Sequence, residues 1–128
     1  MEFAITQGVK VSVTAEYQPY YSSPRLNHYV FSYHIFIQNN SEFAIQLLRR
    51  HWYIVDSLGF KKEVKGDGVV GFQPILEPGE MHDYVSGCNF ATPFGKMYGN
   101  FEMQKLMDGS LFLVQIPAFH LNSPTILN

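Results

Sequence analysis

The chain has 128 residues, of which 46% are hydrophobic, 16% aromatic and 16% charged. These proportions exclude a disordered chain, and the length predicts a single domain over residues 1–128. Nine basic and eleven acidic side chains give a net charge of −2, so no overall field attracts nucleic acid or an anionic membrane. The single cysteine, Cys88, excludes an internal disulfide and a cysteine-rich zinc site.

Alternating apolar and polar residues predict short strands along most of the chain. The pattern is clearest in residues 9–17 and 28–39, whose apolar side chains fall on one face of each segment. Further strands are predicted, in chain order, at residues 42–48, 50–56, 60–64, 80–87, 96–106 and 110–116, with turns at Asp56–Gly59, Pro78–Gly79 and Asp108–Gly109. The first few residues and the stretch after Pro124 are expected to be loosely held.

No stretch of 11 residues carries a convincing helical period, and turn signals separate the strands. Seven or eight short strands in one domain predict an all-β fold, namely an antiparallel β-sandwich of the immunoglobulin or fibronectin type III kind. The amino terminus lacks a signal-peptide pattern, and no apolar run reaches the roughly 18 residues that span a bilayer. We therefore expect a cytoplasmic protein without a membrane partner.

Gly66, Gly68 and Gly71 have the G-x-G-x-x-G spacing of a dinucleotide fingerprint. A Rossmann site also needs a helix that begins within the motif, whereas Pro74 and Pro78 follow here. A P-loop is excluded as well, because Phe72 and Gln73 stand where Lys and Ser or Thr are required. Two interpretations are left: the loop amides form an anion-binding nest, or the glycines only shape turns and allow close packing.

Arg50, His51 and Trp52 form the most functional-looking cluster in the sequence. Alternation places Arg50 and Trp52 on one face of a strand, where a guanidinium and an indole could stack and bind a carboxylate or phosphate. In the alternative interpretation, Trp52 is a core residue that is covered by the aliphatic stem of the arginine. The sequence leaves both open.

Catalytic and metal-binding patterns are not found in the sequence. His28 and His34 lie too far apart on an extended segment to share an ion, and His82 and Asp83 point to opposite faces of a strand. Cys88 has no nucleophile motif around it. We therefore expect no enzymatic activity, no metal and no cofactor.

Five segments, taken together and in this order, resemble the ApaG family. They are LLRRHW at residues 47–52, GDGVVGFQP at 66–74, the PGE-to-SGC segment at 78–88, TPFGKMYGNFEM at 92–103 and IPAF at 116–119. The resemblance implies a fibronectin-like or immunoglobulin-like sandwich in a small bacterial cytoplasmic protein, loosely associated with cobalt and magnesium tolerance. Related domains in eukaryotic F-box proteins and in a polymerase-delta-interacting protein look like protein-binding modules.

The same resemblance implies a pyrophosphate site at Gly66, Gly68 and Gly71. The sequence departs from the family pattern at Phe72, where a polar residue is commoner, and at Arg49, where a small residue is commoner. Because Phe72 makes the loop less polar, it weakens the expectation of anion binding at the loop.

Two functional hypotheses follow from the residues and the resemblance. In the first, the chain is a non-catalytic protein-binding module, a monomer or weak homodimer, with Tyr20, Phe72 and Phe94 as candidate anchors because aromatic residues at segment ends are not obviously needed in a core. In the second, it binds or senses pyrophosphate or a nucleotide through the glycine loop and Arg50. A cation that lies beside the glycine loop in the fold would favour the second hypothesis, and no nucleic-acid partner is expected in either.

Overall fold

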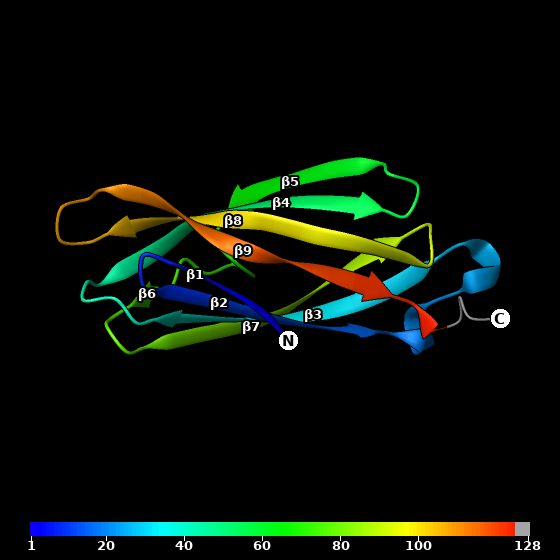
Figure 1. The fold of residues 1–128 in the computed structure, drawn as a ribbon, viewed down its shortest axis with the longest axis horizontal. Helices are drawn as coiled ribbons and strands as arrows, with labels where there is room; N and C mark the ends of the chain where they lie inside the picture. The colour runs from blue at the N-terminus through cyan, green and yellow to red at the C-terminus, as the bar shows by residue number, and fades with distance from the viewer. Residues whose placement is uncertain (125–128) are drawn as a thin grey trace.

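The computed structural model describes residues 1–124, which form two packed antiparallel sheets (Figure 1). The four-stranded sheet has the order β1-β2-β3-β7, and the five-stranded sheet has the order β5-β4-β8-β9 with the short β6 paired to β4. The strands are β1 (Glu2–Thr6), β2 (Val9–Tyr17), β3 (Tyr29–Asn39), β4 (Ile45–Asp56), β5 (Lys61–Asp67), β6 (Ile75–Leu76), β7 (Met81–Phe90), β8 (Phe94–Lys105) and β9 (Leu111–Asn122). This architecture confirms the predicted antiparallel β-sandwich.

The core lies between the two sheets and contains the apolar faces of the predicted strands. Along β3 every second residue from Tyr29 to Ile37 is buried, as the alternation predicts. The Trp52 ring is buried and meets the rings of Tyr33 and Phe119 edge to face, at centroid distances of 5.4 and 6.0 Å. Edge-to-face aromatic contacts of this kind stabilise a core beyond the area that they bury.

The prediction of a loosely held amino terminus was wrong, because Glu2–Thr6 forms β1 at the edge of the four-stranded sheet. A two-residue turn, Gln7-Gly8, joins β1 to β2, and both residues have positive φ, at 49° and 81°. Hairpin turns of this type usually carry Asn-Gly or Asp-Gly, so Gln7 gave little sign of one. The other segment expected to be loose, after Pro124, lies outside the described residues.

The prediction of two separate strands at residues 42–48 and 50–56 was also wrong, because one strand, β4, runs from Ile45 to Asp56. Its pairing with β8 shifts by one residue between Leu47 and Arg49, which makes Leu48 a β-bulge. The bulge changes which residues face the core. The alternation of apolar and polar residues is therefore interrupted at Leu48, and in the sequence this interruption looks like a break between two strands.

The two flanks of the sandwich differ. On one flank β9 lies against β1 and β2, and the Gln115 backbone N–H donates to the Thr6 hydroxyl oxygen at 3.1 Å. On the other flank, β5 and β7 are the edge strands of their sheets, and hollows lie between them. Within residues 1–124, the structure has no helix with the length and apolar character needed to cross a membrane.

Candidate functional site

The bulge at Leu48 places an arginine between the two sheets. Before the bulge, Ile45 and Leu47 face the core; after it, the inward positions pass to Arg50, Trp52 and Ile54. With unbroken alternation, Arg49 would have faced inward and Arg50 outward. The carbonyl of Leu48 accepts hydrogen bonds from the Gly68 N–H at 2.8 Å and from Gln73 Nε2 at 2.9 Å, so the bulge also holds the glycine loop (residues 66–72).

Arg50 lies beside the glycine loop and is held there by the backbone. Its Nη1 donates to the carbonyl oxygens of Asp67 and Gly68, at 3.0 Å in both cases. Gly66 is the cross-strand partner of Arg50, and a Cβ added at Gly66 would lie 2.7 Å from Nη2 of the guanidinium. Gly66 is therefore the residue that gives the guanidinium its room against the strand.

The other two glycines shape the turn that follows β5. Gly68 has φ at +63°, and a Cβ there would overlap the Phe72 carbonyl oxygen. Val69 and Phe72 exchange two backbone hydrogen bonds, of 2.8 and 3.0 Å, around Val70 and Gly71, whose φ angles are 47° and 82°. The result is a two-residue turn with positive φ at both central positions.

The structure thus gives each glycine of the motif a backbone role, as the packing interpretation predicts. The amides of Gly68, Val69 and Phe72 already donate to carbonyls, whereas an anion nest is built from amides that point together at the ligand. Arg50 is nevertheless the adjacent cation that the anion hypothesis requires. An anion-binding function is therefore better sought around the guanidinium than at the loop amides.

A cleft between the sheets opens next to Arg50, on the flank between β5 and β7. Its inner hollow has a volume of about 240 Å³ and is lined by Arg50, Trp52, Val64, Ser86 and Cys88, among others. Its outer hollow has a volume of about 260 Å³ and includes Phe60 and Phe90. Ile54, Lys62 and Asn89 line both hollows, so they form one continuous feature, which we call the inter-sheet cleft.

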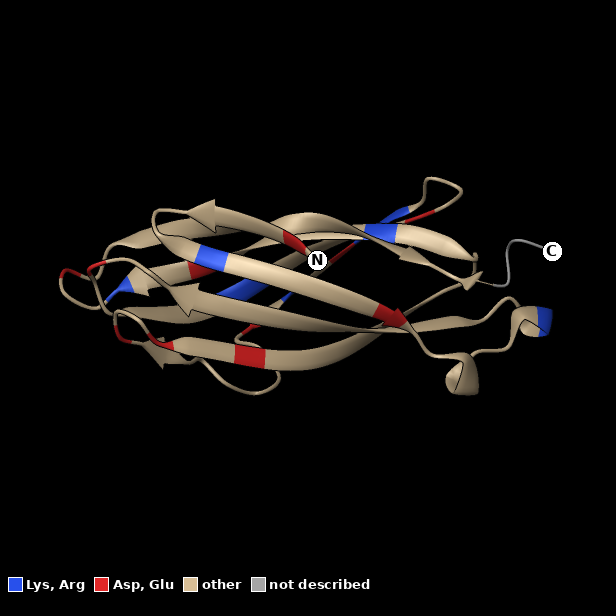
Figure 2. Ribbon diagram, turned by 60° about the horizontal axis from the view of Figure 1, so that its bottom comes forward, with Lys and Arg blue, Asp and Glu red and all other residues tan. Residues whose placement is uncertain are grey.

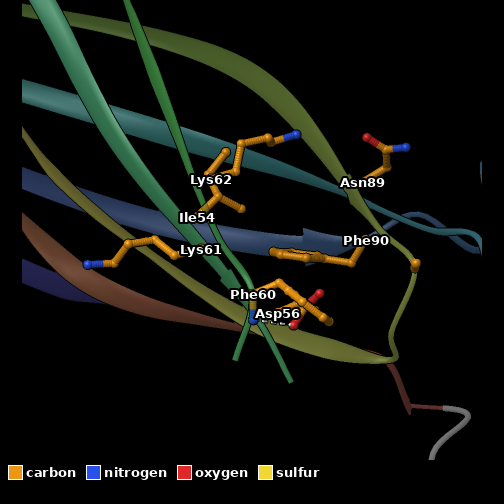
Figure 3. A pocket seen from close by; sticks show the side chains of 8 residues that line it. Ile54, Asp56, Phe60, Lys61, Lys62, Asn89 and Phe90 are labelled. Atoms are coloured by element: carbon orange, nitrogen blue, oxygen red, sulfur yellow. Dashed lines mark hydrogen bonds between the residues drawn. The ribbon is translucent and has the colours of Figure 1, made fainter. Parts of the chain in front are cut away.

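The outer part of the cleft is seen from close by in Figure 3. Lys62 and Asn89 come from facing edge strands and lie on opposite sides of the opening, with the Phe90 ring below them. The neighbouring Lys61 extends in a different direction, toward Tyr53 and Tyr98 on the outer face of the five-stranded sheet, with its Nζ 5.1 Å from the Tyr53 ring centroid. The side chains of Lys61 and Lys62 therefore extend toward opposite faces of β5.

Burial controls the titratable groups around the inner hollow. It raises the pKa of the Cys88 thiol to about 12, so this thiol is protonated and a poor nucleophile at neutral pH. Burial also raises the pKa values of the Tyr33 and Tyr84 phenols. The hydrogen bond with Ser86 lowers the pKa of Tyr33, and the positive charge of Arg50 lowers the pKa of both phenols, but burial outweighs these effects. Among the buried side-chain polar atoms of residues 1–124, the Tyr84 hydroxyl is the one without a hydrogen-bond partner.

The guanidinium does not take the stacked position on Trp52 that the sequence left open. Trp52 is a core residue, and the stem of Arg50 passes beside it to reach the loop carbonyls. The sequence correctly placed both residues on one face, but it gave no sign that Lys62 and Cys88 line the same hollow. Those residues come from β5 and β7, and only long-range pairing brings them together.

The three candidate anchors are all exposed but come from different parts of the fold. Tyr20, in the 3-10 turn η1 (Pro19–Tyr21), is 90% exposed; Phe72, in the glycine loop, is 65% exposed; Phe94, which begins β8, is 38% exposed. Figure 1 places η1 and the start of β8 at one end of the sandwich, whereas the glycine loop follows the end of β5, toward the other end. The three side chains therefore do not form one surface.

An exposed apolar surface that the sequence analysis missed lies on the outer face of the four-stranded sheet. We call it the apolar face; its large members are Met1, Phe3, Ile5, Phe36, Met81 and Val85. Alternation in residues 2–6 was the available signal, since it puts Phe3 and Ile5 on one side of an edge strand.

Histidines pair with carboxylates on the sheet surfaces. His34 Nε2 lies 2.6 Å from Asp83, and His51 Nε2 lies 3.1 Å from Glu63, whose pKa is lowered by this hydrogen bond. Over residues 1–124, no three His, Cys, Asp or Glu side chains are gathered in a group that could hold a metal ion.

Fold and surface together define a small β-sandwich with a polar cleft between its sheets and an apolar outer face. The family model of the ApaG domain matches residues 19–105, and the chain belongs to this family. It is 48% identical to Protein ApaG of Paramagnetospirillum magneticum over 93% of this chain and 91% of that protein, and 49% identical to Protein ApaG of Brucella anthropi over 94% and 92%. It also resembles the crystal structure of a Bordetella pertussis protein named ApaA, with a TM-score of 0.88 and 42% identity over 91% of this chain and 94% of that one.

Proposed function

We propose that this chain is a non-catalytic, cytoplasmic protein-binding module, a monomer or weak homodimer, that binds its partner through the apolar face. The observation that supports this proposal most is the exposure of large apolar side chains on neighbouring strands of one sheet. Ile5 is 61% exposed and Val85 is 57% exposed, although each lies in a regular strand. Contiguous apolar surface of this kind on a folded domain typically marks an interaction site.

Strand register supports the continuity of the apolar face. Phe3 is opposite Ser12, which pairs in turn with Phe36, and the Phe36 ring stacks on His34 at 4.1 Å. His34 is the cross-strand partner of Val85. These contacts link β1 to β7 across the whole width of the sheet.

Charge is sparse on the same sheet. Its four strands carry Glu2, Lys10, Glu16 and Asp83 as their only Lys, Arg, Asp or Glu residues, and β3 has none. Figure 2, in which all charged residues are coloured, shows the strands as mostly tan with separate bands of charge. A partner on the apolar face covers two of these charges: Lys10, whose Nζ lies 4.7 Å from the Phe3 ring centroid, and Asp83, which already pairs with His34.

The outer face of the five-stranded sheet has a different chemistry. Arg49 forms ion pairs with Glu102 and Asp67, and His51 pairs with Glu63. Burial of this charged surface by a partner stabilises a complex less than burial of the apolar face does, because the charges already pair with one another. This contrast favours the four-stranded sheet as the binding side.

The proposal is tested by capture of partners from the cytoplasm of the native organism with wild-type protein and single variants. Ile5→Lys and Val85→Lys should each reduce retention of the same proteins at unchanged melting temperature, because both side chains are exposed and leave the core intact. Leu58→Lys, an equally drastic change at an exposed turn residue on the Asp56–Gly59 turn, is the matched control and should retain them. Equal loss in all three variants, or no protein retained by the wild type, contradicts the proposal.

A second candidate function is binding of pyrophosphate or a nucleotide at the glycine loop, which the position of Arg50 favours. Its test is a titration with pyrophosphate and ATP that follows the amide resonances of Gly66, Gly68 and Gly71. Saturable shifts that are lost in Arg50→Gln would support it. The occupied amides of the loop lead us to expect weak binding at best.

A further inference from the structure

The inner hollow of the inter-sheet cleft carries an uncompensated positive charge, whereas Asp56 lines the outer hollow together with Lys61 and Lys62. Arg50 and Lys62 both line the inner hollow, whereas no Asp or Glu side chain does so. The hydrogen bonds of Arg50 go to neutral carbonyls, and none of the ion pairs found in residues 1–124 involves Arg50 or Lys62. The two cations come from neighbouring strands and face the same space, so the charge is available to a ligand.

The guanidinium is fixed in place before any ligand arrives. Two carbonyls hold its Nη1, and Gly66 leaves room for it against β5. A planar guanidinium held in this way is suited to a carboxylate, which accepts two parallel hydrogen bonds from it. Preorganisation of this kind lowers the entropy lost on binding.

A buried polar group, the Tyr84 hydroxyl, lies on the inward face of β7. The Tyr84 side chain points inward from β7, and its hydroxyl is buried without a hydrogen-bond partner among the described residues. A buried hydroxyl that lacks an acceptor is costly, and Ser86, the next residue along the same inward face of β7, lines the inner hollow.

The walls of the inner hollow are otherwise apolar. Trp52, Ile54, Val64 and Met97 line it together with the protonated thiol of Cys88. A volume of about 240 Å³ equals that of about eight water molecules at roughly 30 Å³ each. A ligand that fits has a negative head and a compact apolar body.

We propose that the inter-sheet cleft binds a small organic carboxylate, with its head between Arg50 and Lys62 and its apolar body against Trp52 and Val64. This inference goes beyond the proposed protein-binding function and does not depend on it, because the apolar face lies on the opposite side of the four-stranded sheet from the cleft. It also differs from the glycine-loop candidate, because the ligand contacts side chains between the sheets and not the amides of the loop.

The test is a titration of isotope-labelled protein with benzoate, followed by amide shifts. Benzoate should bind with a dissociation constant on the order of 1 mM, as expected for so small a ligand. The shifts should map to residues 86–89 of β7 and 62–64 of β5. Neutral benzamide should bind at least about tenfold more weakly, because it lacks the charge that the guanidinium and ammonium recognise.

Two lysines on one strand supply a matched pair of variants. Lys62→Met should weaken benzoate binding by about threefold to tenfold. Lys61→Met should leave it unchanged, because Lys61 lines only the outer hollow and its ammonium extends toward the Tyr53 ring, away from Arg50. The proposal is overturned by equal effects of the two lysine variants, by equal binding of benzamide, or by the absence of saturable shifts. Shifts confined to the glycine loop on addition of pyrophosphate, with none from benzoate, would overturn it and support the loop candidate instead.

Discussion

Because Arg50 packs against Gly66, we expect Gly66→Ala to lower the free energy of unfolding of the wild-type protein but to raise that of a variant without Arg50. Gly66→Ala brings a methyl group within 2.7 Å of the guanidinium, so the arginine must move. Moving it breaks the two hydrogen bonds from Nη1 to the carbonyls of Asp67 and Gly68. We therefore expect Gly66→Ala to destabilise the wild-type protein.

The magnitude follows from two opposing contributions. Each hydrogen bond from a charged donor stabilises by about 1.5 kcal/mol when buried and by less at a half-buried site such as this, so about 2 kcal/mol is lost for the pair. Alanine in a strand with ordinary φ recovers about 0.5 to 1 kcal/mol of backbone entropy relative to glycine. The net loss in free energy of unfolding is about 1 kcal/mol. In an Arg50→Ala background only the entropic gain is left, and Gly66→Ala should stabilise by about 0.5 kcal/mol.

The measurement is a double-mutant cycle from urea denaturation of the four proteins. Gly109→Ala, at the turn between β8 and β9, is the control, because Gly109 neither contacts Arg50 nor accepts a hydrogen bond from it, so its effect should be equal in both backgrounds. If Gly66→Ala has the same effect with and without Arg50, the guanidinium is not held against Gly66. The packing explanation of this glycine would then be refuted.

Three further substitutions or treatments test the local chemistry. Gly68→Ala should lower the free energy of unfolding by about 2 to 4 kcal/mol, through its positive φ and a backbone overlap, as measured by thermal melting. Tyr84→Phe should raise it by about 1 kcal/mol in urea, since an unpaired buried hydroxyl is removed; a loss would reveal an acceptor. Burial raises the pKa of the Cys88 thiol from 9.0 to about 12, so the contribution of the protonated thiol to stability is complete below pH 9.0 and is lost as the pH rises toward 12. The free energy of unfolding of the wild type should therefore fall over this range relative to that of Cys88→Ala, and a constant difference between the two proteins contradicts this.

Alternation along single strands was enough to predict the class of fold. Residues 9–17 and 28–39 have an unbroken period of two, and they form β2 and β3. The predicted face of β3 is buried throughout, whereas on the predicted face of β2 only Val9, Val11 and Val13 are buried and Ala15 is exposed. A period of two is a local property, so it survives without knowledge of the partners of a strand. The prediction for the segment around Leu48 was wrong because a bulge is not a local property: it is visible only in the pairing with β8. In the sequence alone, the bulge looks like the end of one strand and the start of another.

The candidate site was predictable only in part. The sequence identified Arg50 and the three glycines, but not that Gly66 and Arg50 are cross-strand partners. It could not place Lys62 and Cys88 in one hollow with Arg50, because the cleft exists only where the edges of two sheets meet. Spacing in one segment constrains a loop, whereas a cleft between sheets depends on pairings across the whole chain.

The bulge at Leu48 connects the unusual sequence pattern to both the loop and the cleft. One extra residue turns Arg50 inward, and the freed Leu48 carbonyl binds Gly68 and Gln73, which fixes the loop whose own carbonyls hold the guanidinium. Each of these contacts therefore supports the next. Bulges are typically found where a strand must redirect a side chain toward a site. A sandwich that needed only a packed core would bury an apolar residue at position 50, so the inward arginine is better explained by a ligand in the inter-sheet cleft than by stability.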